Sequence, residues 1–207
     1  MSATNVLPAR RAPPKRHAQH GVAAVEFALV AIVFLTVVFG MLELGRIIYM
    51  FNTLSDVTRT AARAASNIDW RNTAELNRAR ARAMFRDSPG ELPFGAPLTD
   101  QDIQIDYLYL KKVGSAVTTE PAASMPASPG RNRLNCLANH YGDGADAAAV
   151  CIRLVRVRIC RGAGAACAPV RYEPIFPLLR LAPYLPMSTT IVTAESLGYR
   201  PGDSMNP

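Results

Sequence analysis

The chain has 207 residues, of which 49% are hydrophobic, 19% charged and 7% aromatic, and its formal net charge is +7. Four of the 23 basic residues precede Gly21 and no acidic residue does, so the remainder of the chain is close to charge balance. It contains no basic run interleaved with aromatic side chains, which nucleic-acid-binding surfaces favour. We therefore expect no nucleic-acid partner.

The N-terminal residues 1–21 predict a basic cytoplasmic leader. They combine the four basic residues with three prolines and show no apolar period. Basic residues directly before a membrane span favour the cytoplasmic side, so we expect the chain after Leu42 to lie outside the cytoplasm. A cleaved signal peptide is the alternative. The apolar run that follows is longer than the usual signal-peptide core, however, and no A-x-A-like site comes after it.

An apolar run from Gly21 to Leu42 predicts a transmembrane helix. A hydrocarbon core about 30 Å thick requires roughly 20 helical residues, which this run supplies. Glu26 is its one charged residue. A carboxylate near the bilayer centre costs about 3 kcal/mol and less near the interface, so Glu26 is a candidate functional residue. The alternative is a side chain that merely extends to the cytoplasmic interface.

The helix is predicted to continue past the membrane. No proline occurs between Gly21 and Pro89, and apolar or small residues recur at helical spacing from Leu44 to Ala65. We predict a transmembrane and stalk helix over residues 22–66. Its alanine-rich end permits close approach of another backbone, from a sheet of the same chain or from a neighbouring helix.

Residues 67–207 predict an extracytoplasmic α+β domain. Asn72 and Glu75 form a capping-box pattern that opens a second helix through Phe85. Period-two alternation or β-branched runs predict three strands, at residues 103–109, 150–160 and 189–196. The segments 111–133 and 174–186 are interpreted as a long loop and as a proline-rich apolar loop. The fold class is thus a long N-terminal transmembrane and amphipathic helix followed by a small antiparallel sheet domain.

Four cysteines all fall in this domain, and no two of them form a C-x-x-C pair. That spacing argues against a metal or redox motif, whereas an extracytoplasmic location favours disulfides in one of three connectivities. Cys160 and Cys167 bracket a turn and form a natural local bridge. Cys136 with Cys151 would then join the long loop to the strand, which makes the domain disulfide-stapled.

Catalytic patterns are missing from the sequence. His17 and His20 belong to the leader or its end, and His140 lies in a polar, glycine-rich loop. There is no G-x-S-x-G, no phosphate-binding loop and no metal-ligand cluster, and the GDGAD segment at residues 142–146 is interpreted as a turn. We expect no enzyme, no cofactor and no metal site.

Three segments of the first helix carry a family resemblance. They are GVAAVEFALV at residues 21–30, FGMLELGR at 39–46 and DVTRTAARAA at 56–65. Together they resemble TadE-like minor pilins, or pseudopilins, of the tight-adherence (Tad) pilus system within the type IVb pilus family. Major pilins of this group commonly carry tyrosine after the glutamate and are much shorter, so Phe27 and the length of this chain favour a minor role.

The resemblance implies how the N-terminus is processed. A prepilin peptidase would cut between Gly21 and Val22, leaving Glu26 as the assembly carboxylate and Phe27 as the adjacent aromatic residue. Cleavage would create an α-amino group at Val22, with an ordinary pKa near about 8. Val22 and Glu26 are one helical turn apart, so the ammonium and the carboxylate would gain by pairing, within one subunit or with a neighbour.

The resemblance also implies a function and a location. We expect a minor pilin that takes part in assembly of an adhesive Tad-type pilus. It would cross the bacterial inner membrane once, with a cytoplasmic N-terminus and a periplasmic C-terminal domain. Its partners would be the inner membrane, the prepilin peptidase, other pilin and pseudopilin subunits and the assembly platform. The alternative is a single-pass anchored periplasmic binding or scaffolding protein that never enters a pilus and in which Glu26 is incidental.

Overall fold

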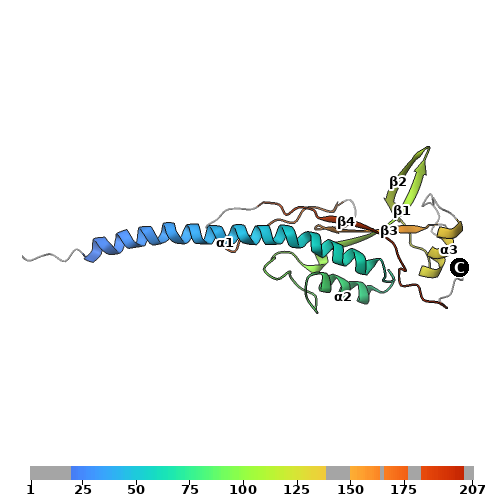
Figure 1. The fold of residues 1–207 in the computed structure, drawn as a ribbon, viewed down its shortest axis with the longest axis horizontal. Coiled ribbons are helices and arrows are strands. Elements are labelled where there is room, and N and C mark those ends of the chain that lie inside the picture. Colours follow the sequence, from blue (N-terminus) through green and yellow to red (C-terminus); the bar gives the residue numbers. More distant parts are fainter. Residues whose placement is uncertain (1–19, 139–149, 164–165, 177–182, 203–207) are drawn as a thin grey trace, which may run out of the picture. The chain divides into compact units, whose positions relative to one another are not determined.

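The computed structural model describes residues 20–138, 150–163, 166–176 and 183–202. The chain divides into two compact units, residues 1–41 (unit 1) and residues 42–207 (unit 2). The leader, His140 and the GDGAD segment fall outside the described residues. The elements, shown in Figure 1, are α1 (His20–Ala65), α2 (Thr73–Ala83), the 3₁₀ turn η1 (Asp100–Asp102), β1 (Ile103–Val113), β2 (Ala116–Pro121), α3 (Pro129–Ala138), β3 (Ile152–Ile159) and β4 (Thr189–Thr193).

Helix α1 supplies most of what is described in unit 1. This part of the helix is long and apolar enough to cross a membrane, and its large side chains are exposed rather than packed into the protein. An apolar helix without a protein core around it is typical of a membrane span. The first helix therefore indicates single-pass membrane anchoring.

The rest of α1 belongs to unit 2 and forms one wall of its core. Every third or fourth side chain is buried, as the predicted stripe requires. The buried members are Met50, Leu54, Val57, Ala61, Ala62 and Ala65. The last three are alanines, whose small side chains lie in the core. Thr58 shows what this stripe covers, because its hydroxyl lies 2.9 Å from the Thr190 hydroxyl of β4.

A four-stranded antiparallel sheet forms the other wall, in the order β2-β1-β3-β4. Alternation along β3 buries Val155, Val157 and Ile159 in the same core as the α1 stripe. The opposite face of β3 carries two arginines, Arg156 and Arg158. Both pair with Asp106 of β1, at 3.0 and 2.8 Å. The sheet therefore has one apolar and one charged face, as the predicted α+β class requires.

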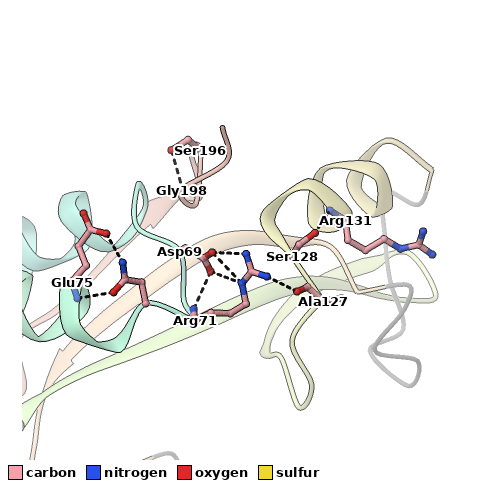
Figure 2. Close-up of polar contacts among 9 residues, drawn as sticks. Asp69, Arg71, Glu75, Ala127, Ser128, Arg131, Ser196 and Gly198 are labelled. Carbon is pink, nitrogen blue, oxygen red and sulfur yellow. Dashed lines mark hydrogen bonds and ion pairs between the residues drawn. The ribbon is translucent and has the colours of Figure 1, made fainter. Parts of the chain in front are cut away.

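Helix α2 begins with the predicted cap. The Asn72 side chain accepts from the Glu75 backbone N–H at 3.1 Å and donates to the Glu75 carboxylate at 3.0 Å. In the turn before it, Arg71 pairs with Asp69 at 2.7 Å and donates to the Ala127 carbonyl at 3.0 Å (Figure 2). The turn between α1 and α2 is thereby tied to the segment that precedes α3.

The prediction of a long loop over residues 111–133 is wrong. β2 pairs with β1 around a tight turn at Gly114, whose φ of 63° suits glycine. The second element, α3, begins after Ser128, whose hydroxyl accepts from the Arg131 backbone N–H at 3.0 Å (Figure 2). Neither element has an apolar face, because β2 is almost wholly exposed and the buried side of α3 includes Asn132 and Asn135. Periodicity therefore did not reveal them.

Two disulfides staple unit 2. Cys136 of α3 is bonded to Cys151, and Cys160 is bonded to Cys167. The second bridge closes a hairpin turn in which Arg161 and Ala168 exchange backbone hydrogen bonds of 2.8 and 2.9 Å. These are the two pairs expected from the sequence, and the α+β, disulfide-stapled fold class is confirmed. Part of the proline-rich segment 174–186 lies outside the described residues.

Candidate functional site

The predicted processing and assembly residues all lie in the first two turns of α1. Val22 is 59% exposed and Phe27 is 75% exposed. A Cβ added at Gly21 would meet no atom within 4 Å, so folding of the described chain does not require glycine there. Val22 and Glu26 are four residues apart in a continuous helix and so share one face.

The two polar side chains of the apolar run, Thr36 and Glu26, differ in whether they have a hydrogen-bond partner. The Thr36 hydroxyl donates to the Ile32 carbonyl of its own helix at 2.8 Å. Glu26 is exposed and has no hydrogen bond or ion pair with any residue that the structure describes. Its carboxylate is therefore available to a group outside the subunit, or to the α-amino group that cleavage would create.

The predicted disulfide cysteines lie in unit 2 and are consumed in their two bridges. Within the described ranges, no group of three or more histidine, cysteine, aspartate or glutamate side chains is arranged to hold a metal ion. The candidate site lies on α1, where Val22, Glu26 and Phe27 are exposed.

A second polar group on α1 lies where unit 2 begins. The Glu43 side chain is 1% exposed and the Arg46 side chain 7% exposed, and the two form an ion pair of 3.3 Å one turn apart. Tyr172, also buried, donates a hydrogen bond to Glu43 Oε1 and accepts one from Arg46 Nη1 at 3.2 Å. We call these three residues the Glu43–Arg46–Tyr172 cluster.

Arg46 joins two distant segments to the helix. Its Nε donates to the Phe94 carbonyl and its Nη2 to the Ala96 carbonyl, both at 2.7 Å. Its Nη1 donates to the Glu173 carbonyl at 2.8 Å. The planar guanidinium thus donates hydrogen bonds to carbonyls of two loops at once. A lysine ammonium could not reproduce this arrangement of donors.

The electrostatics of the cluster follow from its burial. Removal from water, followed by the hydrogen bond to the Glu43 carboxylate, raises the pKa of Tyr172 to about 12, although the Arg46 charge opposes that shift. The Arg46 guanidinium lies 5.0 Å from the Tyr172 ring centroid, close enough for a cation–π contact. Glu43 Oε1 also accepts from the Ile175 backbone N–H at 3.1 Å, whereas Oε2 has no hydrogen-bond partner among the described residues.

Sequence reasoning missed this cluster as a site. The sequence places Glu43 and Arg46 in the mixed-charge flank after the span and in the FGMLELGR segment that carries the family resemblance, with Arg46 off the apolar stripe, and indicates no partner for either. The available signal was two opposite charges at i, i+3, on a stretch where Leu42, Leu44 and Ile47 are apolar. Charges in such a setting usually have buried partners.

The comparison with protein families bears on this helix. The model of the TadE family, described as TadE-like protein, matches residues 21–63. Over these residues the chain is TadE-like. The TadE-like segment contains Glu26 and Phe27 as well as Glu43 and Arg46 of the cluster. No curated protein and no solved structure matches the chain.

The match supports a pilus association. TadE-like proteins are pilus-associated and structural rather than enzymatic, so the TadE-like segment links the chain to Tad pili and to their subunits. It covers α1 almost to its C-terminal end at Ala65. The sheet and both disulfides lie beyond the TadE-like segment.

Proposed function

We propose that the chain is a minor pilin that takes part in assembly of an adhesive Tad-type pilus. The observation that carries the proposal is the Glu26 carboxylate, which is exposed, has no hydrogen-bond or ion-pair partner among the described residues, and lies one turn after Val22 in a TadE-like segment. A charge kept on an otherwise apolar helix gains most from an opposite charge that arrives with another subunit or with processing.

The proposed sequence of events begins at the leader. Residues 1–21 stay in the cytoplasm, residues 22–66 form the membrane and stalk helix, and residues 67–207 form the periplasmic domain of an inner-membrane protein. A prepilin peptidase cuts after Gly21, where the absence of a side chain suits an extended backbone in the peptidase site. The new ammonium of Val22 then pairs with Glu26 of its own or of a neighbouring subunit.

This pairing would set the register between helices. Desolvation strengthens the attraction between the two charges, because the effective dielectric in lipid and between packed helices is low. The exposed Phe27 ring lies next to the carboxylate in sequence and adds apolar contact area at the same level of the helix. Glu26 thus acts in assembly and has no catalytic role.

Replacing Glu26 tests the assembly role. Glu26→Ala is expected to insert into the membrane normally and to lose pilus assembly, measured by pilus yield and by crosslinking to other pilins. Thr36→Ala is the matched control, because it removes the other polar side chain of the apolar run, and it should assemble normally. Normal assembly by Glu26→Ala would contradict the proposal and favour an anchored periplasmic scaffold.

Cleavage is tested separately by intact-mass measurement in cells that contain the peptidase. The wild-type chain is expected to lose residues 1–21, whereas Gly21→Leu should retain them. Gly40→Leu is the control, since a Cβ at Gly40 also meets no atom within 4 Å, and it should be cut like the wild type. Retention of the leader by the wild-type chain would refute the processing step.

A further inference from the structure

An apolar cavity opens beside the Glu43–Arg46–Tyr172 cluster. Its volume is about 390 Å³, and its walls are almost entirely apolar. Besides the two charged residues, the lining consists of Leu42, Gly45, Tyr49, Phe94, Ile175 and Phe176. All of these residues belong to unit 2 and come from three segments that are far apart in the sequence.

Three large apolar side chains around the cavity face outward. Phe94 is 80% exposed, Leu42 is 59% exposed and Ile175 is 58% exposed. Single exposed apolar side chains are ordinary on protein surfaces, but three that surround one apolar cavity mark an interaction site. We call Leu42, Phe94 and Ile175 the apolar collar.

The collar is held in place by the buried charges. Arg46 fixes the loop of Phe94 through two carbonyls, and the Tyr49 hydroxyl donates to the Pro93 carbonyl of the same loop at 3.2 Å. Glu43 fixes the other loop by accepting the Ile175 backbone N–H. The cluster therefore positions Phe94 and Ile175 against α1 before any partner arrives.

The loop that contains Phe94 has a tightly constrained backbone. Phe94 has a φ of 57°, a conformation that is unfavourable for a bulky residue. At the next position, a Cβ on Gly95 would lie 2.4 Å from Leu92 Cδ2, so the turn is tightly packed from within. What distinguishes Phe94 is that its 80% exposed ring also lines the apolar cavity.

We propose that the apolar collar inserts into the headgroup region of the bilayer that α1 spans. This inference rests on the membrane anchoring in the proposed function. Leu42 is the last residue of the apolar run and also lines the cavity, so the collar continues the lipid-contacting surface along the chain. From Leu42 to Tyr49 the helix rises about 10 Å, enough to cross the roughly 5–8 Å headgroup layer of one leaflet.

The chemistry of the collar fits a lipid surface. Tyr49 combines a ring with a hydroxyl group, and tyrosine is enriched at membrane interfaces. Apolar side chains that enter an interface bury about 5–10 Å into it, a depth that Phe and Ile side chains on loops can reach. The collar would hold unit 2 against the outer surface of the inner membrane while the subunit waits to be assembled.

Tryptophan quenching by brominated lipid tests the inference. The full chain is reconstituted into vesicles of phosphatidylethanolamine and phosphatidylglycerol, with bromine near the top of the acyl chains. Phe94→Trp, and Ile175→Trp as a second site, are expected to lose about half of the added tryptophan emission. The wild-type chain, whose single tryptophan is Trp70, supplies the baseline.

Phe85→Trp is the matched control. Phe85 also has a φ of 57° and is 60% exposed, but it follows α2 and does not line the cavity. Its added emission should be unquenched. Equal, weak quenching at positions 94 and 85 would overturn the inference. So would a signal at position 94 that depends on the amount of protein per vesicle and not on bromine, because a second copy would then cover the collar.

Alkaline extraction of the same vesicles separates the two proposals. A chain that is extracted does not span the bilayer, which contradicts the anchoring itself. A chain that resists extraction but shows no quenching at either collar position is anchored, and only the collar inference is then refuted.

Discussion

Arg46 attaches two loops of unit 2 to α1. Its guanidinium donates to carbonyls at Phe94, Ala96 and Glu173 and pairs with Glu43. A buried ion pair is not in itself strong evidence of stabilisation, since desolvation offsets much of the attraction. Removing one partner is costly, however, because the other charge and the three carbonyls lose their compensation.

Arg46→Ala should therefore lower the free energy of unfolding of unit 2 by about 3–5 kcal/mol. Arg46→Lys should recover only part of the loss, because an ammonium cannot reproduce the fork of donors. The measurement is denaturant unfolding of the full chain in detergent, followed by near-UV circular dichroism. Arg59→Ala, on an exposed position of the same helix, should change stability by less than about 0.5 kcal/mol. Similar losses from both alanine variants would contradict the role assigned to Arg46.

Tyr172 predicts a loss of stability at high pH. Burial raises the pKa of Tyr172 to about 12 from an ordinary value of 10.0. The unfolded chain then loses this proton at lower pH than the folded chain does. The stabilisation is accordingly complete below about pH 10 and disappears as the pH rises toward about 12.

Phenolate absorbance during alkaline titration checks this directly. Tyr172 should ionise late, and Tyr172→Phe should remove a late-titrating group and leave the early ones unchanged. Burial also raises the pKa of Tyr107 to about 12, so the late absorbance change of Tyr107 should remain in that variant. Tyr184→Phe is the control, because Tyr184 is 57% exposed. If Tyr172→Phe removed an early-titrating group, the burial argument would fail.

The sequence allowed Glu26 to be identified and left the cluster unrecognised, for a physical reason. Glu26 can be recognised from the sequence because it is the one charged residue within an apolar run, and its immediate sequence neighbours are enough to show this. The role of Arg46 depends on carbonyls 48, 50 and 127 residues away, which only the folded chain brings together. The local sequence pattern indicates that a charged residue needs a partner. It does not indicate which loop supplies that partner.

At the level of elements, α1 carries a gradient in side-chain size along its buried stripe. Met50, Leu54 and Val57 give way to Ala61, Ala62 and Ala65, all nearly inaccessible to solvent. The small residues leave no room for added methylene groups where the helix meets the sheet. Beside this contact, Ala64 lines a separate cavity of about 240 Å³ between α1 and α2.

Ala62→Leu should destabilise unit 2 by about 1–3 kcal/mol through overpacking. Ala64→Leu makes the same chemical change two residues away but has space to fill, so it should be neutral or slightly stabilising. Thermal unfolding of the two variants checks the contrast. Equal destabilisation would mean that α1 does not pack closely on the sheet at Ala62.

The elements that escaped prediction are those stabilised by polar contacts. Helix α3 is attached to β3 by Asn132, whose side chain accepts from the Ile152 backbone N–H at 2.7 Å and donates to its carbonyl at 3.2 Å. Asn135 donates to the Val150 carbonyl at 2.9 Å. The start signal was present in Ser128 followed by Pro129, a favourable cap and first position. With an amide-rich buried face, however, the helix has no apolar period to confirm it.

For the whole molecule, the two disulfides link folding to compartment. Cys136–Cys151 closes a loop of 15 residues and Cys160–Cys167 one of 7. The loop-entropy model assigns each bridge about 2–3 kcal/mol of stabilisation, which is lost in a reducing cytoplasm. The proposed periplasmic location of unit 2 therefore predicts that all four cysteines are oxidised in the membrane-inserted chain.

Maleimide labelling in cells tests this expectation. The inserted chain should react only after reduction, and then at four positions. A variant that lacks residues 20–42 and stays in the cytoplasm should react at four positions without reduction. Free thiols in the inserted chain would place unit 2 on the cytoplasmic side and reverse the proposed orientation.

Residues 195–198 are bound to the C-terminal end of the first helix. The Ser66 carbonyl accepts from the backbone N–H groups of Glu195 and Leu197 at 3.2 and 3.0 Å. Gly198 lies so close that an added Cβ would be 2.6 Å from the Asp69 backbone nitrogen. Residues 195–198 thus lie beside the C-terminal end of α1, within unit 2. A fluorescent or affinity tag joined to the C-terminus would follow these residues in the sequence, which makes this terminus a natural place for a reporter that leaves the processing and collar residues unaltered.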